Sequence, residues 1–335
     1  MWNMRLNNSR NRILYLHFCI LTMTIQATLL QAQATCRETV MSKSALSSLP
    51  PLDALEAESY TQTQVAQFQQ LLQTRMQHIQ AQHPQHKVHF MAFWDFDGTI
   101  LDGDISYGSL RPDALVQRQP RKPGEFAGMF ERVIRQGLLP DFTPNDEGVV
   151  QFFTKVLPQE PASHYYEAGL MANLPLERKV AIERLAAQTF GELEHKIFAF
   201  SRAILHFLRE QGVEVYVLSA SSQVFLREAA DLLPLDRERI TGLNLDLNEN
   251  NQRIDPFFNF REGKRDRLFH LLKPKAEDHP QQKRFPLLAI GDSWASDGPM
   301  IRAVSDVGGF GVLVNSPCSR KAEFAHDNFH ELAIR

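Results

Sequence analysis

The sequence predicts an α/β fold, with a Rossmann-like parallel sheet and a helical cap inserted after the first strand. Three observations support this prediction. Short apolar runs alternate with helical stretches, polar residues follow three of these runs, and more than 100 residues separate the first run from the second. Alternation of strands and helices is typical of a parallel sheet. A chain of 335 residues is long enough for one large domain, or for a domain with a substantial insert.

Residues 1–34 have the layout of a secretory signal peptide. Three arginines precede an apolar run over 13–30, which ends at the small residues Ala32 and Ala34. We expect cleavage after Ala34 and export to the periplasm, with a retained membrane anchor as the alternative. Cleavage removes three of the 36 basic residues and none of the 39 acidic ones. A mildly acidic chain without a basic stripe is expected to bind a small molecule and no nucleic acid, and a cleaved chain has no stable membrane association.

Two cysteines remain after this cleavage, Cys36 and Cys318. In an oxidising compartment an isolated pair of cysteines can form a disulfide. Two free thiols are the alternative, and the spacing does not decide between them.

A helix is expected over 53–82, within an N-terminal helical extension over 35–87. Its apolar residues recur at intervals of three and four among glutamines, which is the period of a helix with one apolar face. We expect this face to pack on the outside of the main domain.

Four apolar runs are expected to form buried strands, and polar residues follow three of them. The runs are Val88–Trp94, Val213–Leu218, Phe285–Ile290 and Phe310–Val314. Asp95 and Asp97 follow the first run, Ser219 follows the second, and Asp292 follows the third. Because the carboxyl ends of the strands form the ligand crevice of an open α/β sheet, we expect these side chains to meet at one edge.

The long interval after the first strand is expected to form the cap, over 104–194, whereas 88–103 and 195–335 form the α/β core. Four amphipathic segments indicate helices in this interval: Phe126–Leu138, Gly148–Leu157, His164–Leu174 and Leu176–Phe190. A crossover between parallel strands needs only about a dozen residues. The excess is expected to cover the crevice, where it excludes water and selects the substrate.

Asp95 and Asp97 carry the strongest chemical signal. Two carboxylates, two residues apart at the end of a strand, reach one site if the chain leaves the strand at Gly98. One carboxylate can then attack phosphorus while the other transfers a proton. A surface Asp-Gly turn is the alternative for an isolated pair.

The segment 95–99, Asp-Phe-Asp-Gly-Thr, resembles motif I of the haloacid dehalogenase-like superfamily, and the later motifs occur in the order of that family. Ser219 matches the serine or threonine of motif II, Lys264 matches the lysine of motif III, and 291–297 matches the acidic motif IV. The resemblance spans about residues 88–306. It implies the α/β core of this superfamily and an enzyme that forms an aspartyl-phosphate intermediate.

The resemblance also implies a role for each motif residue, and the chemistry of phosphate transfer agrees with these roles. Asp95 is the expected nucleophile and Asp97 the expected acid and base. The expected phosphate-binding residues are Thr99, Ser219, Ala220 and Lys264, and the expected Mg²⁺ ligands are Asp95, the backbone carbonyl of Asp97, Asp292 and Asp297. A phosphoryl group in transfer needs positive charge and hydrogen-bond donors around its oxygens, and oxygen ligands suit Mg²⁺.

Two positions bear on the type of reaction and on the metal site. Asp97 favours a phosphatase over a dehalogenase, because an alkoxide leaving group needs a proton. Asp297 lies five residues after Asp292, whereas phosphoserine phosphatases usually have their second acid at four. Direct ligation of the metal by Asp297 therefore stays open.

The position of the insert, together with a hairpin expected over 244–255, resembles the phosphoserine phosphatase-like branch. That branch has an acidic residue nine positions after the nucleophile, which contacts the amino group of the substrate. Asp104 occupies this position, and a turn aspartate beside Gly103 is the alternative. Arg132 or Arg135 is the candidate partner for a substrate carboxylate.

A small phosphorylated amino compound similar to phosphoserine is therefore the expected substrate. If neither arginine faces the pocket, a phosphocholine or phosphoethanolamine phosphatase is the alternative, with Trp94, Trp294 and Tyr107 as candidates for an ammonium cage. A broad-specificity acid phosphatase or phosphotransferase is a further alternative. A non-catalytic binding protein on the same scaffold is disfavoured, because no motif residue is missing.

Overall fold

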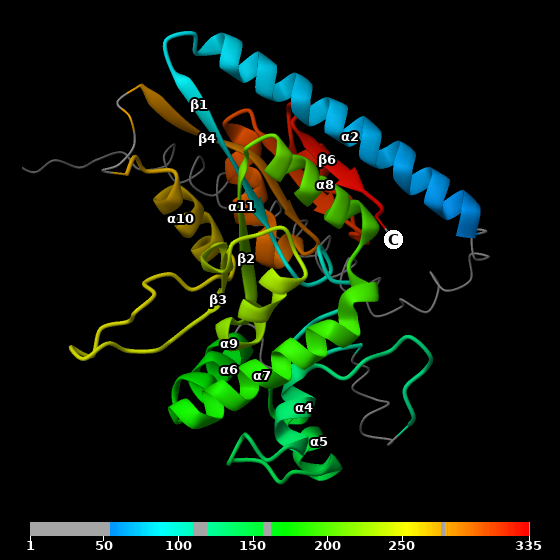
Figure 1. Ribbon diagram of the computed structural model, residues 1–335, viewed down its shortest axis with the longest axis vertical. Coiled ribbons are helices and arrows are strands. Elements are labelled where there is room, and N and C mark those ends of the chain that lie inside the picture. Colours follow the sequence, from blue (N-terminus) through cyan, green and yellow to red (C-terminus); the bar gives the residue numbers. More distant parts are fainter. Residues whose placement is uncertain (1–53, 110–118, 157–161, 276–278, 280, 335) are drawn as a thin grey trace, which may run out of the picture. The chain divides into compact units, whose positions relative to one another are not determined.

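A computed structural model describes residues 54–109, 119–156, 162–275, 279 and 281–334 (Figure 1). Residues 55–316 and 320–335 form one compact unit, and the following description concerns that unit. The expected signal peptide and Cys36 lie outside the described residues. Among the described helices, none is both long and apolar enough to span a membrane.

A six-stranded parallel sheet forms the centre of this unit, in the order β3-β2-β1-β4-β5-β6. The strands are β1 (Lys87–Trp94), β2 (Glu214–Ser222), β3 (Ile240–Leu243), β4 (Gln282–Gly291), β5 (Phe310–Val314) and β6 (Phe329–Leu332). The predicted fold class and the four predicted strands are confirmed. Sequence analysis missed β3 and β6, which have four residues each and too little apolar character to stand out.

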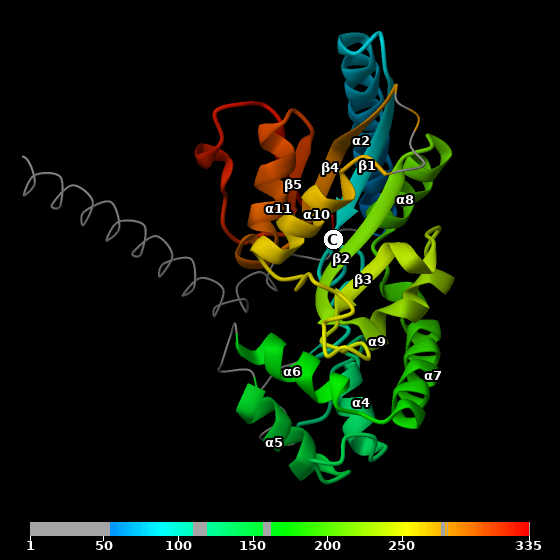
Figure 2. The same ribbon diagram turned by 90° about the vertical axis from the view of Figure 1, so that its left-hand side faces the viewer.

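Helices cover both faces of the sheet (Figure 2). The helices α2 (Ala54–Gln82) and α8 (Ala199–Glu210) lie on one face, and α10 (Glu262–Leu271) and α11 (Trp294–Asp306) lie on the other. Strand β1 shows how alternation divides the core, because Ala92 and Trp94 join the first apolar cluster while Met91 and Phe93 join the second. The predicted N-terminal helix is confirmed, and its Phe68 packs on Phe200 of α8 with the ring centroids 5.6 Å apart.

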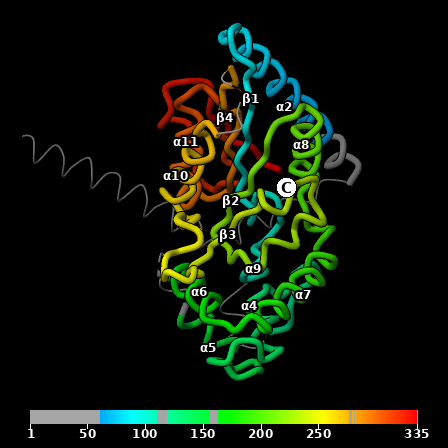
Figure 3. Tube along the Cα trace, turned by 60° about the vertical axis from the view of Figure 1, so that its left-hand side comes forward, coloured from blue at the N-terminus to red at the C-terminus, as the bar shows by residue number. Residues whose placement is uncertain are grey.

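Four helices of the insert lie together beyond the carboxyl ends of β1 and β2 (Figure 3). They are α4 (Met129–Arg135), α5 (Asp146–Val156), α6 (Ala162–Ala172) and α7 (Leu176–Leu193). The short helix α9 (Gln223–Leu226) follows β2, and the 3₁₀ helices complete the description: Glu194–Lys196, Arg227–Asp231, Arg237–Arg239 and Lys321–Glu323. We use "the cap" for the four helices α4, α5, α6 and α7 from here on.

The hairpin expected over 244–255 is confirmed. Leu247 and Arg253 form an antiparallel bridge, and Asn248 N–H donates to the carbonyl of Gln252 at 2.8 Å. The hairpin precedes the helix α10, so the chain returns from it directly to the edge of the sheet where Lys264 lies.

Candidate active site

Asp95 follows β1 directly, and the next residues fold back toward β4. The backbone N–H of Asp95 donates to the carbonyl of Ile290 at 2.8 Å, which continues the pairing of the two strands to the edge of the sheet. Gly98 has φ +69°, and a Cβ atom at this position would lie 2.0 Å from Oδ2 of Asp292. Glycine is therefore required here twice, for the left-handed backbone and for the close approach of Asp292.

Lys264, in the first turn of α10, joins two of the acidic residues. Its side chain is fully buried, and Nζ donates to Oδ1 of Asp95 at 2.6 Å and to Oδ1 of Asp297 at 2.5 Å. Burial alone lowers the pKa of a lysine, but Asp297 and Asp95 outweigh it and raise the pKa of Lys264 above its ordinary value. Lys264 is therefore a permanent cation beside the expected nucleophile.

Asp95, Asp292 and Asp297 form an acid cluster, in which each residue offers one carboxylate oxygen and these oxygens lie within 4.8 Å of one another. Burial raises the pKa of Asp95 to about 8, and repulsion from Asp297 adds to this effect. Burial and the neighbouring Asp95 raise the pKa of Asp292 well above its ordinary value. Three carboxyl groups share one lysine, so their full ionisation would leave an excess of negative charge, and a cation bound in the cluster would offset it.

An all-oxygen cluster of this size fits Mg²⁺, which prefers carboxylate ligands and compact geometry. The sequence left the role of Asp297 open, and the structure places this side chain in the cluster with its Oδ2 accepting from Ser293 N–H at 3.1 Å. The backbone carbonyl of Asp97, the other expected ligand, stays a prediction.

Asp97 is held by donors on both of its carboxylate oxygens. Ile105 N–H donates to Oδ1 at 2.6 Å, and Ser221 Oγ–H donates to Oδ2 at 2.7 Å. Burial and the nearby Asp104 raise the pKa of Asp97 to about 8, against the opposing effect of these hydrogen bonds. A carboxyl group that keeps its proton near neutral pH is suited to act as a general acid.

Ser221 was missed by sequence analysis, although a signal for it exists. Ser219 and Ser221 are two residues apart in β2, and side chains at that spacing lie on the same face of a strand. A search for further polar residues on the face of Ser219 finds Ser221.

The expected phosphate-binding residues differ in what the structure shows. Ser219 is fully buried, and its Oγ accepts from Ser221 N–H at 2.9 Å and lies 3.4 Å from Oδ2 of Asp97. Ala220 is half-buried between the two serines. Thr99 is fully buried and its carbonyl accepts from Ser201 Oγ at 2.6 Å, while its own Oγ1 has no hydrogen-bond partner among the described residues. Thr99 therefore joins the loop after β1 to α8.

Asp104 lies in the loop that follows the nucleophile segment. Its Oδ1 accepts from Tyr107 N–H at 2.8 Å, as in an aspartate turn. Burial raises the pKa of Asp104 to about 7; the hydrogen bond from Tyr107 opposes this and the nearby Glu167 adds to it. Glu167, from the cap helix α6, accepts from the hydroxyl of Tyr107. Asp104 and Glu167 thus form a second acidic group, near the acid cluster.

The two candidate arginines bind acidic residues of the chain itself. Arg132 donates to Glu192 at 2.7 Å, and Arg135 donates to Glu131 at 2.9 Å and pairs with Asp146 at 2.6 Å. These contacts place both guanidinium groups within the cap, and in the part of the chain that the structure describes no contact brings either of them to the acid cluster.

The three aromatic residues considered for an ammonium cage also pack elsewhere. Trp94 is fully buried in the first apolar cluster. Trp294 packs edge-on against Phe324 and Phe329, with centroid distances of 5.8 and 6.1 Å. Tyr107 stacks on Phe130 and donates to Glu167. The structure therefore does not bring these three rings together as a cage.

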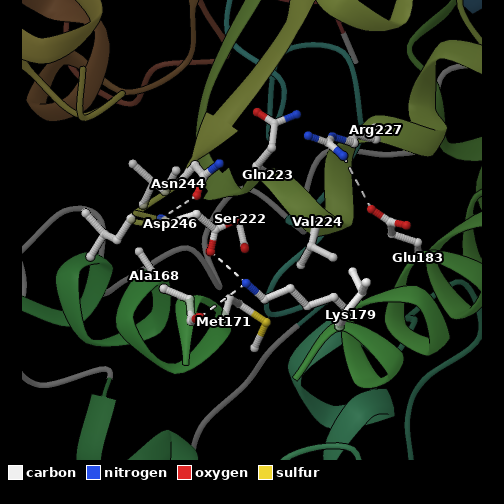
Figure 4. Close-up of a pocket in the computed structure, with 14 residues that line it drawn as sticks. Ala168, Met171, Lys179, Glu183, Ser222, Gln223, Val224, Arg227, Asn244 and Asp246 are labelled. Carbon is white, nitrogen blue, oxygen red and sulfur yellow. Dashed lines mark hydrogen bonds and ion pairs between the residues drawn. The ribbon is translucent and has the colours of Figure 1, made fainter. Parts of the chain in front are cut away.

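A cavity of about 170 Å³ lies at the seam between the cap and the core, lined by α6, α7 and the segments that follow β2 and β3 (Figure 4). Lys179 of α7 points into it and donates to Asp246 at 2.6 Å, and Arg227 pairs with Glu183 of α7 at 3.5 Å. No residue of the acid cluster lines this cavity.

Cys318 is disulfide-bonded. Because Cys36 lies outside the described residues, its pairing with Cys318 stays a prediction.

The family model of the haloacid dehalogenase-like hydrolases matches residues 92–302. Among curated proteins, no sequence matches the chain. Similar solved structures include a conserved protein of unknown function from Anaerococcus prevotii, with 15% identity over 73% of this chain and 85% of that chain and a TM-score of 0.44. A phosphoserine phosphohydrolase-like protein from Francisella tularensis shares 14% identity over 68% and 87%, with a TM-score of 0.36. A phosphoserine phosphatase with a phospho-aspartyl intermediate analogue shares 16% identity over 74% and 94%, with a TM-score of 0.33. The family model covers more than half of the sequence and every residue of the acid cluster, and the chain belongs to the haloacid dehalogenase-like hydrolases.

Proposed function

We propose that this hydrolase cleaves phosphate monoesters with the help of Mg²⁺, through an acyl phosphate formed transiently on Asp95. One observation carries the proposal: the buried Lys264 amine lies between Asp95 and Asp297, with Asp292 in the same cluster of oxygens. A nucleophilic carboxylate, a cation for the phosphate oxygens and a set of oxygen ligands for a metal are the components that phosphoryl transfer requires.

The reaction has two steps. A carboxylate oxygen of Asp95 attacks phosphorus, the bond from phosphorus to the ester oxygen breaks, and Asp97 gives its proton to the departing alkoxide. Asp97, now ionised, then takes a proton from water. This water attacks the phosphorus on Asp95, the bond from phosphorus to the Asp95 oxygen breaks, and inorganic phosphate is released. Lys264 neutralises charge on the phosphate oxygens. Asp95, Asp292 and Asp297 would hold Mg²⁺, which would supply further positive charge where two anions must approach each other.

The acidic pair of Asp104 and Glu167 supports a substrate with an amino group. Asp104 lies near Asp292 of the acid cluster and near Glu167 of the cap, and negative charge there favours a cationic head group. Arg132 and Arg135 already bind carboxylates of the cap, which favours a head group without a carboxylate of its own. Since the three aromatic rings form no cage, a primary amine such as phosphoethanolamine is preferred over phosphocholine, and phosphoserine is the next candidate.

A panel of phosphate monoesters tests this function. The assay measures hydrolysis of phosphoethanolamine, phosphoserine, phosphocholine and p-nitrophenyl phosphate by the wild type and by Asp95→Asn. Each reaction is run with Mg²⁺, after removal of the metal by EDTA, and after Mg²⁺ is added back. We expect hydrolysis by the wild type, reversible loss with EDTA, and a loss of at least about 10³-fold in the variant. Full activity of Asp95→Asn refutes the mechanism. Adding glycerol and measuring glycerol phosphate separates hydrolysis from phosphotransfer.

We further propose that the chain is exported and that Cys36 pairs with Cys318. The disulfide at Cys318 supports an oxidising compartment, because cytosolic disulfides are rare. The N-terminal sequence of the protein purified from the periplasm, and a peptide map without reduction, test the two parts separately. An intact N-terminus contradicts cleavage after Ala34, and a Cys318 peptide with another partner contradicts the pairing.

A further inference from the structure

Two serine hydroxyls form a chain that ends on Asp97. Ser106 Oγ–H donates to Ser221 Oγ at 2.8 Å, and Ser221 Oγ–H donates to Oδ2 of Asp97 at 2.7 Å. Both serines are buried, with exposed fractions of 2% and 5%, so water competes little for these hydroxyls. With Ile105 N–H on Oδ1, and a longer contact from Ser219 Oγ to Oδ2 at 3.4 Å, both oxygens of the carboxyl group have donors, and its rotation is restricted.

The residues that reach Asp97 also bind the cap. The carbonyl of Ile105 accepts from Met129 N–H at 2.8 Å, and the carbonyl of Ser106 accepts from Phe130 N–H at 3.1 Å. Met129 and Phe130 begin the helix α4 of the cap. Residues 105–106 therefore hold Asp97 on one side and α4 on the other.

Two glycines permit this close contact between the loop and the start of α4. A Cβ atom on Gly128 would lie 2.5 Å from the carbonyl oxygen of Ser106, and a Cβ atom on Gly108 would lie 2.4 Å from Gly128 N. Neither position has room for a side chain, so the backbones touch directly. The contact between the cap and residues 105–106 is thus fixed by backbone packing and leaves little freedom to Ser106.

We propose that Ser221 and Ser106 are positioning residues that direct the acid Asp97 at the leaving-group oxygen, and that residues 105–106 join this orientation to the cap helix α4. The inference rests on the proposed function, because it assumes that Asp97 protonates a departing alkoxide. A general acid must lie within hydrogen-bond reach of the atom that it protonates, and a displacement of about 1 Å can cost about 10²-fold in rate.

The basicity of the leaving group distinguishes this role from a merely structural one. An alkoxide is strongly basic and needs the proton as its bond to phosphorus breaks, whereas p-nitrophenoxide is weakly basic and departs without it. A misdirected Asp97 therefore slows alkyl phosphates and spares the aryl phosphate. Damage to phosphate binding or to the fold slows both substrates alike.

The experiment compares Ser221→Ala with Ser222→Ala, a matched change at the next residue, which has no hydrogen bond to Asp97. The quantity measured is kcat/KM for the best alkyl phosphate of the panel and for p-nitrophenyl phosphate. It reports the steps up to departure of the leaving group and excludes the later hydrolysis, in which Asp97 acts as a base. We expect Ser221→Ala to lose about 10- to 100-fold on the alkyl phosphate and about threefold or less on the aryl phosphate. We expect Ser222→Ala to keep both values.

Ser106→Ala supplies a second test at a residue that does not touch Asp97. It should lose less than Ser221→Ala, with the same preference for the aryl phosphate. The double variant should lose no more than Ser221→Ala, since Ser106 acts through Ser221. If Ser221→Ala does not fold, as judged by thermal unfolding, the losses of Ser106→Ala in kcat/KM on the two substrates alone decide whether the inference holds.

Equal losses on the two substrates, or no loss on the alkyl phosphate, overturn the inference while leaving the phosphatase in place. A wild type without activity on any phosphate monoester overturns the proposed function and this inference with it. The two failures are therefore distinguishable.

Discussion

Substitution of Gly98 by alanine tests whether the loop after β1 holds Asp292 in the acid cluster. The added Cβ atom would lie 2.0 Å from Oδ2 and 2.5 Å from Cγ of Asp292, whereas ordinary contact begins at 3.4 Å. The carboxylate must therefore retreat by about 1.4 Å. The left-handed backbone, at φ +69°, adds a cost of about 1–2 kcal/mol in the free energy of folding.

Gly212→Ala is the matched control for this change. Gly212 has φ +70°, nearly the same as Gly98, and a Cβ atom there would meet no heavy atom of the described residues within 4 Å. Gly212→Ala is expected to lose about 1–2 kcal/mol of stability in urea unfolding from backbone strain, and Gly98→Ala at least as much, because it carries the same strain and the clash with Asp292. Only Gly98→Ala displaces a residue of the acid cluster.

The assay measures hydrolysis of the best substrate across a range of Mg²⁺ concentrations for both variants, with unfolding in urea measured in parallel. For Gly98→Ala we expect a higher Mg²⁺ requirement and a kcat/KM about 10²-fold lower at saturating Mg²⁺, which is the usual cost of a displacement near 1 Å. For Gly212→Ala we expect wild-type values. If the two variants differ by less than about threefold in kcat/KM and share one Mg²⁺ requirement, the position of Asp292 does not matter and the reasoning fails.

Three further substitutions test other parts of the site and of the fold. Lys264→Met is expected to abolish activity and to cost about 3–5 kcal/mol of stability, since it leaves buried carboxylates without their partner; wild-type stability in chemical unfolding contradicts this. Asp104→Asn is expected to raise KM for phosphoethanolamine about 10-fold while kcat/KM for p-nitrophenyl phosphate stays constant, and equal losses on both substrates remove its recognition role. The hydrogen bond from His89 lowers the pKa of Glu214 to about 2, below the ordinary 4.5 of the unfolded chain. The stability that Glu214 contributes, roughly 3 kcal/mol, is therefore present above pH 4.5 and lost as the pH falls toward 2, and Glu214→Gln should remove this acid-dependent part of the unfolding free energy.

The sheet and the acid cluster were predictable because they depend on local patterns. Each long apolar run forms a strand, and the carboxyl ends of parallel strands meet at one edge, so Asp95 and Asp292 had to lie near each other. Strands β3 and β6 were not predictable in this way. They are the two edge strands of the sheet and have four residues each. Pairing with the neighbouring strand, which is a tertiary contact, makes them strands.

The side-chain partners of the site were less predictable, since they depend on contacts between distant segments. Arg132 and Arg135 have the charge that a substrate carboxylate requires, but in the structure they pair with Glu192 and Glu131 of the chain itself. Glu192 is 60 residues from Arg132 in sequence, and no local pattern reveals such a pairing. Ser221 is the opposite case, because its position two residues after Ser219 indicates that both hydroxyls lie on one face of β2.

The contacts between the cap and the core differ in strength along the seam. Phe130 of α4 packs on Phe225 with centroids 5.0 Å apart, and Phe190 of α7 packs on Phe96 at 5.8 Å. All four rings are buried in one apolar cluster that runs through both parts, so lifting the whole cap would expose side chains worth about 1.5–3 kcal/mol each. The two ion pairs of α7 at the seam are partly exposed, and such pairs contribute only about 0–1 kcal/mol each. Polar contacts therefore yield before apolar ones, and we expect the ion-paired side of the seam to separate first, while the phenylalanine contacts keep α4 and residues 105–106 in place against Asp97.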